Sequence, residues 1–445
     1  MKLEANSRRP LAGLRGVGRA LQHRNYRLFF AGQTLSLIGT WLTRIATSWL
    51  VYRLTGSALL LGVVGFVGQL PTFLLGPLAG VWVDRWNRHR TLLVTQVLAM
   101  VQSGLLAFFA LRGTITVTHV LGLSVVQGLI NAVDMPARQS FVVEMIERRE
   151  DLPNAIALNS SMVTAARLLG PSIGGVLIAS VGEGYCFAID AVSYLAVIAS
   201  LWAMRVTAPQ RPPKKAAAWT EFLEGLRYVT GHPPIRSLLL LLALVSLMGM
   251  PYTVLMPVVA TRVLHGSAHT LGFLMASSGL GALVGALYLA SRQSVIGLGR
   301  LIPVSAAAFG AGLVAFSRSS VLWVSLVLML LTGLAMMIQL AGSNTLVQTL
   351  VDEDKRGRVM SFFAMAFFGS APFGSLLAGT LADRIGAPNT LLLGGGVCIL
   401  GAAIFLRALP GLRETARPTY VRLGLLPEVP STVQSATELS LPAED

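Results

Sequence analysis

The sequence of 445 residues is poor in charge: Asp, Glu, Lys and Arg together make up 12% of it. Soluble proteins carry about 25% charged residues, and 54% of this chain is hydrophobic. Cysteine is also scarce. Cys186 and Cys398 both fall in apolar stretches far apart in the sequence, so a disulfide framework is not indicated. This composition excludes an ordinary soluble domain and predicts a protein that crosses a membrane several times.

Several kinds of chemistry lack the residues that they need. The six histidines all lie in or beside predicted loops, which argues against a histidine proton relay inside the membrane. No phosphate loop of the form Gly-x-x-x-x-Gly-Lys-Ser/Thr is present, so nothing indicates use of ATP. No nucleophilic or metal-ligating constellation stands out, and we expect neither an enzyme nor a metal or other cofactor. The net charge of +15 would suggest nucleic acid in a soluble chain, but in a membrane protein its placement matters more.

Twelve apolar stretches are each long enough to cross a bilayer as a helix, which takes about 20 residues. They lie at 28–51, 58–83, 91–111, 117–137, 158–181, 185–205, 237–259, 271–291, 300–317, 320–342, 358–381 and 388–407. The predicted architecture is therefore an all-α membrane protein of twelve transmembrane helices. Its segments are an N-terminal segment 1–25, a six-helix bundle 26–205, a linker 206–236, a second six-helix bundle 237–409 and a disordered tail 410–445.

The polar segments indicate how the chain lies in the membrane. Twenty-eight of the 35 Lys and Arg residues fall on the side of the N-terminus, so both termini are predicted to be cytoplasmic and to face anionic lipids. In the linker, Trp219, Phe222, Leu223 and Leu226 follow helical spacing and predict an amphipathic helix on the membrane surface. Residues 1–25 contain no apolar core or cleavage site, although an Arg-rich start is also typical of an organellar transit peptide.

A short charged hinge joins the second and third spans. It contains Gly80, Asp84, Arg85, Arg88 and Arg90. Glycine permits close backbone approach, the carboxylate can cap a helix or pair with a base, and the arginines can reach that carboxylate or lipid phosphate. A generic basic hinge would share these charges. The spacing Gly-x-x-x-Asp-Arg-x-x-Arg, however, resembles the loop between helices 2 and 3 of the major facilitator superfamily, with Asn87 at a position where glycine is usual.

Further motifs narrow this resemblance to the branch that contains enterobactin exporters and transmembrane secretion effectors. They are Trp41-Leu-Thr-Arg44, Asp134-Met-Pro-Ala-Arg138, Leu152-Pro-Asn-Ala-Ile-Ala-Leu-Asn159 and Lys355-Arg-Gly-Arg-Val-Met-Ser361. The resemblance implies the major facilitator fold, two six-helix pseudo-repeats with a substrate site at their interface. Within the sequence, Gly170-Pro-Ser-Ile-Gly-Gly175 is echoed 200 residues later by Ser370-Ala-Pro-Phe-Gly-Ser375.

The fifth span resembles the antiporter motif of the superfamily. Gly170, Pro171, Gly174 and Gly175 match it, while Ala157 and Ala166 replace two upstream glycines. The resemblance implies exporter-type packing. The structural alternative is a kinked and tightly packed helix, because proline removes one backbone donor and small residues allow close approach.

Polar side chains inside the spans are candidates for substrate binding or coupling, because charge within a bilayer is costly. Arg44 and Arg167 can bind an anionic substrate or steer a proton, or instead be satisfied structurally. Asp190 is the acid best placed to change protonation, or else forms a structural hydrogen bond. The neutral candidates, each also able to form interhelical hydrogen bonds, are Gln33, Gln69, Asn131, Gln339 and Asn344.

The resemblance also implies a gate in which Asp84 faces the eleventh span and Arg138. Such a cluster would stabilise one state of the transporter and break in the other. We therefore expect a monomeric, proton-coupled exporter of a small organic molecule in the plasma membrane, with a siderophore, drug or metabolite as substrate. The alternatives are an uptake symporter for an anionic or neutral solute and a membrane-embedded protein with no transport role.

Overall fold

The computed structural model describes residues 18–205, 218–292 and 294–423, and these ranges are helical apart from short connections. The first half consists of α2 (Arg24–Thr55), α3 (Ala58–Arg85), α4 (Arg88–Leu111), α5 (Val117–Val142), α6 (Leu152–Val181) and α7 (Glu183–Ala203), with short turns η1 (Arg19–Gln22) and η2 (Arg149–Asp151). The linker helix is α8 (Ala218–Gly231). The second half consists of α9 (Pro233–Leu244), η3 (Val245–Gly249), α10 (Tyr252–Val258), η4 (Val259–Val263), α11 (Ala268–Ser291), α12 (Leu298–Ser317), α13 (Leu322–Leu350), α14 (Arg356–Ala364), η5 (Met365–Gly369), α15 (Ser370–Ile385) and α16 (Ala387–Arg422).

The number of crossings agrees with the twelve predicted spans. Among the described residues, eleven helical segments are long and apolar enough to cross a membrane. The twelfth crossing is α2, whose 32 residues extend about 48 Å at 1.5 Å per residue. Its hydropathy is lower because it carries Gln33, Arg44 and several serines and threonines. Polar residues in a crossing helix suit a helix that faces protein or a polar cavity rather than lipid.

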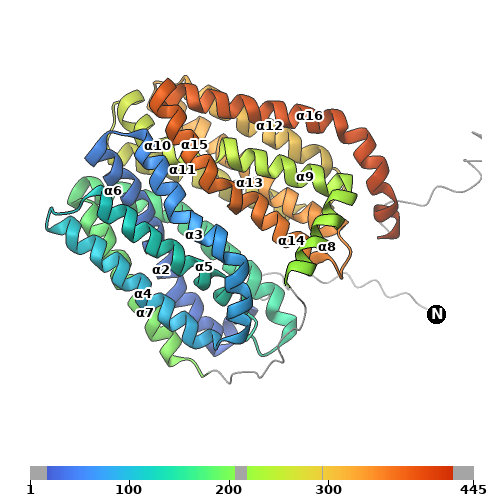
Figure 1. Ribbon diagram of the computed structural model, residues 1–445, viewed down its shortest axis with the longest axis horizontal. Coiled ribbons are helices and arrows are strands. Elements are labelled where there is room, and N and C mark those ends of the chain that lie inside the picture. The colour runs from blue at the N-terminus through green and yellow to red at the C-terminus, as the bar shows by residue number, and fades with distance from the viewer. Residues whose placement is uncertain (1–17, 206–217, 293, 424–445) are drawn as a thin grey trace, which may run out of the picture.

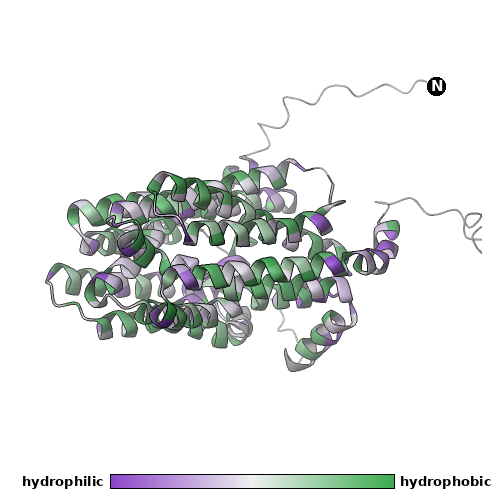
Figure 2. Ribbon diagram, turned by 90° about the horizontal axis from the view of Figure 1, so that it is seen from above, coloured by the Kyte–Doolittle hydropathy of each residue, from purple (hydrophilic) through white to green (hydrophobic). Residues whose placement is uncertain are grey.

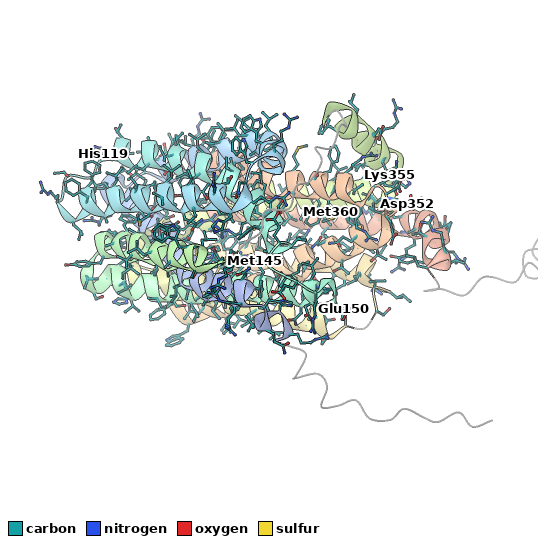
Figure 3. The ribbon with its side chains drawn as sticks, turned by 90° about the horizontal axis from the view of Figure 1, so that it is seen from below. His119, Met145, Glu150, Asp352, Lys355 and Met360 are labelled. Atoms are coloured by element: carbon teal, nitrogen blue, oxygen red, sulfur yellow. The ribbon has the colours of Figure 1, made fainter. Side chains whose placement is uncertain are left out.

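Successive crossings alternate in direction, so the connections divide between two faces. The terminal face carries the start of α2, helix α8 and the end of α16, and the distal face is the opposite end of the bundle. Figure 3 shows His119, near the start of α5, at the distal end, and Glu150, Asp352 and Lys355 at the terminal end. Hydrophobic residues predominate along the helices between the two faces (Figure 2).

The two halves repeat one packing pattern. In the first half α2 and α4 pack on α7 and α3 packs on α5, while in the second half α9 and α12 pack on α16 and α11 packs on α13. In Figure 1 the first half, blue to green, lies beside the second half, yellow-green to red. This repeated pattern confirms the predicted fold of two six-helix bundles.

The halves are joined close to the distal face by two pairs of glycines. A Cβ atom on Gly62 of α3 would lie 2.9 Å from the Cα of Gly379 of α15, and one on Gly175 of α6 would lie 2.6 Å from the Cα of Gly272 of α11. Real Cβ atoms do not approach a backbone so closely, so these positions need glycine. Both pairs sit four residues after the start of one helix and six residues before the end of the other. The structure is therefore closed at the distal face.

Two crossings of the second half are interrupted by π-helical turns, η3 in the seventh crossing and η5 in the eleventh. The hydroxyl of Ser246 in η3 donates a hydrogen bond to the carbonyl oxygen of Phe367 in η5. A π-turn leaves backbone carbonyls without their regular helical donors, and a hydroxyl from a neighbouring helix satisfies one of them. This hydrogen bond thus links the two π-helical turns.

Two terminal-face segments test predictions made from sequence. The linker helix α8 is present, and the side chains of Phe222, Leu223 and Leu226 are partly exposed, with the Phe222 ring packing on Phe362 of α14. The predicted tail 410–445 is wrong at its start, because α16 continues as a helix to Arg422. The reason is packing: Ala416 is buried, and Leu412 and Tyr420 pack against the core of the second half. Residues 424–445 lie outside the described part of the chain.

Candidate functional site

Two membrane arginines meet at one tryptophan near the middle of the first half. Arg44 lies three residues after Trp41 on α2, and its guanidinium carbon is 5.2 Å from the centre of the Trp41 ring. Arg167 reaches the same ring from α6, at 5.9 Å. Both distances are within the range of cation–π attraction, which partly offsets the unfavourable desolvation of a guanidinium. We call Trp41, Arg44 and Arg167 the tryptophan–arginine cluster.

The glycines of α6 determine how closely α6 approaches α2. A Cβ atom on Gly170 would collide with the Cβ of Trp41, and one on Gly174 would lie 2.6 Å from the Cγ2 of Ile45. Gly170 and Gly174 therefore let α6 lie directly against α2, and Arg167 is placed one turn before Gly170 on the same helix. Gly175 and Pro171 instead face α11 of the other half, where Pro171 O would be 3.1 Å from a Cβ on Gly272. The glycine motif of α6 thus packs both against α2 of its own half and against α11 of the other half.

The cluster also touches the second half of the molecule. Nη2 of Arg167 lies 3.8 Å from Sδ of Met336, a buried residue of α13. Gln339 and Ser343 follow Met336 at helical spacing and are 1% exposed. The Gln339 Nε2 and Ser343 Oγ atoms have no hydrogen-bond partner among the described residues. The α13 face near Arg167 therefore carries buried polar groups with unused bonding capacity.

Asp190 lies apart from the tryptophan–arginine cluster, inside the first half. Its carboxylate is 1% exposed and accepts hydrogen bonds from Thr43 Oγ1 and Ser103 Oγ, both at 2.7 Å. These donors come from α2 and α4, while Asp190 stands on α7. Its Oδ1 atom has no partner among the described residues. Asp190 thus links three helices and keeps one carboxylate oxygen unused.

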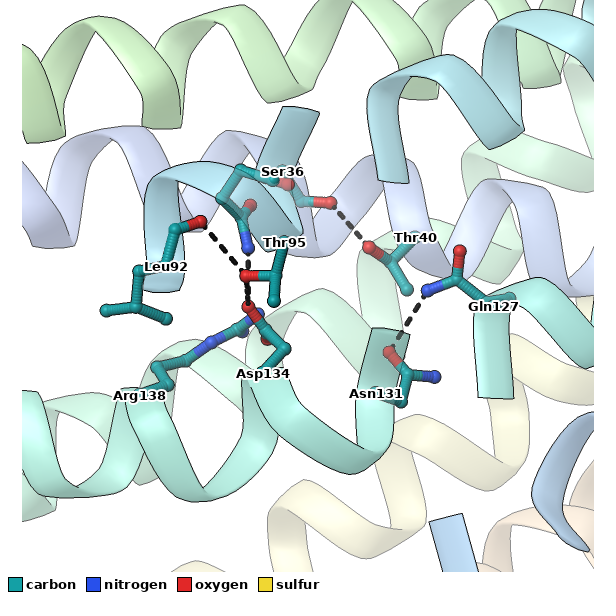
Figure 4. A network of polar contacts seen from close by, with 9 residues as sticks. Ser36, Thr40, Leu92, Thr95, Gln127, Asn131, Asp134 and Arg138 are labelled. Atoms are coloured by element: carbon teal, nitrogen blue, oxygen red, sulfur yellow. Dashed lines mark hydrogen bonds and ion pairs between the residues drawn. The ribbon is translucent and has the colours of Figure 1, made fainter. Parts of the chain in front are cut away.

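A second buried carboxylate, Asp134 of α5, is the centre of the network in Figure 4. Thr95 Oγ1 and Gln96 Nε2 of α4 donate to its Oδ1 at 2.8 Å and 2.7 Å, and Arg138 forms an ion pair with its Oδ2. Asp134 is 5% exposed. The network fixes α4 against α5 at the terminal half of both helices. In this structure the guanidinium of Arg138 is therefore paired with the carboxylate of Asp134.

The other predicted polar residues make local contacts or are simply buried. Gln127 donates to Asn131 at 3.0 Å and Gln348 donates to Asn344 at 2.9 Å, each pair one turn apart on its own helix. Gln33 is 2% exposed. Gln69 donates to the carbonyl oxygen of Gly65, four residues earlier, at 3.1 Å. The structure thus does not bring these residues together at the tryptophan–arginine cluster.

The hinge between α3 and α4 is a short turn held by its own capping residue. The side-chain oxygen of Asn87 accepts from the backbone N–H of Arg90 at 3.0 Å. Asn87 has φ −73° and ψ 106°, so the left-handed conformation that permits asparagine in place of glycine is not used. Arg88 pairs with Glu144 at 2.6 Å, both nearly buried, and Arg85 is exposed. Gly80 and Asp84 lie near the end of α3, and the side chain of Asp84 is outside the described part of the structure.

Sequence reasoning missed a contact that crosses between the halves at the distal face. Nη2 of Arg262 in η4 donates to the carbonyl oxygen of Gly56 at 2.9 Å, and its guanidinium carbon lies 5.8 Å from the ring centre of Tyr52. A cavity of about 330 Å³ adjoins this contact, lined by Gly56, Arg262 and Asp383 among others. From sequence Arg262 is an ordinary loop base, since nothing local indicates a partner some 200 residues away.

Comparison with known proteins defines the family. Residues 19–422 match the family model described as transmembrane secretion effector. The chain belongs to this family of major facilitator transporters. It is thus a multi-pass membrane transporter and not an enzyme, as the sequence predicts.

Relatives and solved structures agree over most of the transporter. It is 25% identical to the staphyloferrin A transporter of Staphylococcus aureus, a match that covers 85% of this chain and 96% of that protein. It is 27% identical to the multidrug efflux pump Tap of Mycolicibacterium fortuitum and 24% identical to macrolide efflux protein A of Streptococcus pyogenes, each over 96% of the relative and 87% or 86% of this chain.

The solved structures show the fold. An inward-facing bacterial homologue of the lysosomal transporter Spinster has a TM-score of 0.64 and 16% identity, covering 90% of this chain and 98% of its own. The human organic anion transporter MFSD10 has a TM-score of 0.62 and 15% identity, covering 86% and 99%.

Proposed function

We propose that the transporter exports a small organic molecule with an anionic group, which binds at the tryptophan–arginine cluster. The observation that carries this proposal is the meeting of Arg44 and Arg167 at one indole ring, beside the contact of Arg167 with Met336 of the other half. Two guanidinium groups can hold a carboxylate or phenolate, and the indole can stack on an aromatic or apolar body. A siderophore, an acidic drug or an acidic metabolite has this chemistry, and the efflux relatives support export.

In the transport cycle the tryptophan–arginine cluster would be open first to one face of the membrane and then to the other, by alternating access. The glycine pairs close the distal face, and the contact of Arg167 with α13 makes the site sensitive to movement of one half against the other. We place both termini in the cytoplasm, since most Lys and Arg residues lie on that side. On this orientation the described state is closed to the outside. Separation of the glycine pairs would release substrate there.

Proton coupling is assigned to Asp190. Its carboxylate is buried among hydroxyl donors from two other helices, and one oxygen is unused. A protonated Asp190 carboxyl donates a hydrogen bond itself, so the hydroxyl of Thr43 or Ser103 would then accept a hydrogen bond instead of donating one. The packing of α2 and α4 on α7 would change as a result. Asp190→Asn is expected to keep substrate binding while removing the drive from a pH gradient. Gradient-driven transport at the wild-type rate in this variant would exclude Asp190 as the coupling group.

The binding site itself is tested with purified protein and a panel of anionic and cationic amphipathic compounds. Arg44→Gln and Arg167→Gln should each weaken binding of an anionic compound about tenfold or more, since a hydrogen bond to a charged group is worth roughly 1.5–3 kcal/mol. Arg318→Gln, at the distal face, is the matched control. Tight binding of cations alone, or equal binding by all variants, would contradict the assignment.

A further inference from the structure

A groove of about 780 Å³ lies on the first half at its terminal-face end, away from the tryptophan–arginine cluster. It is lined by residues of α4 and α5 and by Arg85 and Trp86 at the end of α3. Its walls are apolar, with Val94, Leu98 and Leu129 among them, and these side chains are 58%, 48% and 44% exposed. Side chains of this kind on the outside of a membrane bundle face lipid, so the groove opens toward the bilayer.

The mouth of the groove is basic. Arg85 and Arg90 both line it and are exposed, and neither forms an ion pair with another described residue. Asn87 and Thr91 add polar groups between them. Two cations at the head of an apolar channel form a surface complementary to a molecule with an anionic head and a hydrocarbon chain.

Aromatic residues indicate where the mouth lies relative to the membrane. Trp86 lines the groove, is 51% exposed and stacks on Trp82, with ring centres 6.1 Å apart and planes at 24°. Exposed tryptophans at the end of a crossing helix favour the level of the lipid head groups. The arginines therefore stand at head-group height and the apolar walls at the depth of the acyl chains.

We propose that this groove binds one anionic phospholipid of the leaflet at the terminal face. Its phosphate lies between Arg85 and Arg90, and one acyl chain follows the apolar walls of α4 and α5. Basic pockets between membrane helices are suited to anionic head groups. The volume is also in the range of specific small-molecule sites, roughly 300–1,000 Å³.

A bound lipid would affect the packing of the first half through the back wall of the groove. Thr95 lines the groove and donates to Asp134 at 2.8 Å, in the network that holds α4 against α5. A bound chain would therefore press on the two helices that the Asp134–Arg138 pair joins. The site makes the thermal stability of the first half depend on lipid charge.

The experiment measures lipid binding to the purified full chain in detergent by native mass spectrometry, with phosphatidylglycerol and phosphatidylcholine as probes. Wild type should bind one phosphatidylglycerol in preference to phosphatidylcholine. Each nearby basic residue contributes about 1 kcal/mol to attraction of anionic lipid, or about fivefold, so Arg85→Gln/Arg90→Gln should bind phosphatidylglycerol about 25-fold more weakly. Leu129→Trp, which fills the groove, should weaken binding while leaving both arginines in place.

The control is Arg300→Gln/Arg413→Gln, which removes two exposed terminal-face arginines of the second half and so matches the change in net charge. Equal loss of binding in this control would mean diffuse attraction and would overturn the site. Unchanged binding in Arg85→Gln/Arg90→Gln would overturn it as well. Inorganic phosphate at millimolar concentration should not displace the lipid, and displacement would show an anion site without an acyl-chain groove.

Discussion

One added methyl group at Gly175 should shift the transporter away from its distal-closed state. Gly175 of α6 faces the backbone of α11, where the new Cβ would lie 2.6 Å from the Cα of Gly272 and 2.9 Å from the carbonyl oxygen of Ala268. Both neighbours are main-chain atoms, so no side-chain rotation relieves the overlap. In Gly175→Ala, α6 and α11 must move apart, and the clash disappears when the halves separate.

The size of the effect follows from the cost of overpacking. Inserting a methyl group into a tight contact costs about 1–3 kcal/mol. A cost of about 2 kcal/mol borne by the closed state alone would change the ratio of open to closed molecules about thirtyfold. Gly62→Ala tests the same reasoning at the other glycine pair, where the new Cβ would lie 2.9 Å from the Cα of Gly379.

The assay is the labelling rate of a cysteine placed in the distal cavity. Ala58→Cys serves as the reporter because Ala58 lines that cavity and is 7% exposed, while Cys186 and Cys398 are buried. A membrane-impermeant maleimide should react many times faster in the Gly175→Ala background. Gly104→Ala is the control, since a Cβ there meets nothing within 4 Å. Equal labelling in Gly175→Ala, Gly104→Ala and the parent would refute the proposed role of the glycine pair.

Three further perturbations address other contacts. Arg262→Gln removes the hydrogen bond to Gly56 across the distal face and should raise the labelling rate of the same reporter several-fold. An unchanged labelling rate would mean that the glycine pairs alone keep the distal face closed. Asp134→Asn leaves the cation of Arg138 without its carboxylate and should lower stability in detergent by about 3 kcal/mol, whereas the double variant Asp134→Asn/Arg138→Gln should recover part of the loss. The Arg422 guanidinium holds the pKa of Asp352 below its usual value, so the contact of α16 with the end of α13 is complete above about pH 4 and is lost as the pH falls further, through the lowered pKa. Hydrogen exchange at the end of α16 should rise in that range in wild type but not in Asp352→Asn.

The crossings could be predicted from sequence because hydropathy and length depend on local composition alone. All twelve spans are predicted from their apolar length, although α2 is less apolar than the other eleven crossings of the described residues. The end of α16 could not be predicted in this way. Pro410 reads as a helix end, yet it removes one hydrogen bond only, and the buried contacts of Ala416 and Leu412 keep the helix intact.

The candidate site was predicted in its residues but not in its geometry. Charge inside a span identifies Arg44, Arg167 and Asp190, because such residues are costly in lipid. Their grouping depends on which helix faces pack together, and that is decided by contacts such as Gly170 against Trp41. Trp41 belongs to a motif that carries the family resemblance, but nothing in that motif indicates that both arginines meet at its ring. The separation of Asp190 from the arginines likewise appears only when the helices are assembled.

The central claim is that Arg44 and Arg167 bind an anionic substrate. The transporter exports this substrate in exchange for protons that move down their gradient. The direct measurement is proton movement in everted vesicles under an imposed pH gradient, on addition of acidic amphipathic compounds. Wild type is predicted to release protons from the vesicle with substrate uptake, Arg44→Gln and Arg167→Gln to lose the response, and Arg318→Gln to keep it. Substrate-driven proton flux of wild-type size in both cluster variants, or flux in the direction of uptake into cells, would contradict the account.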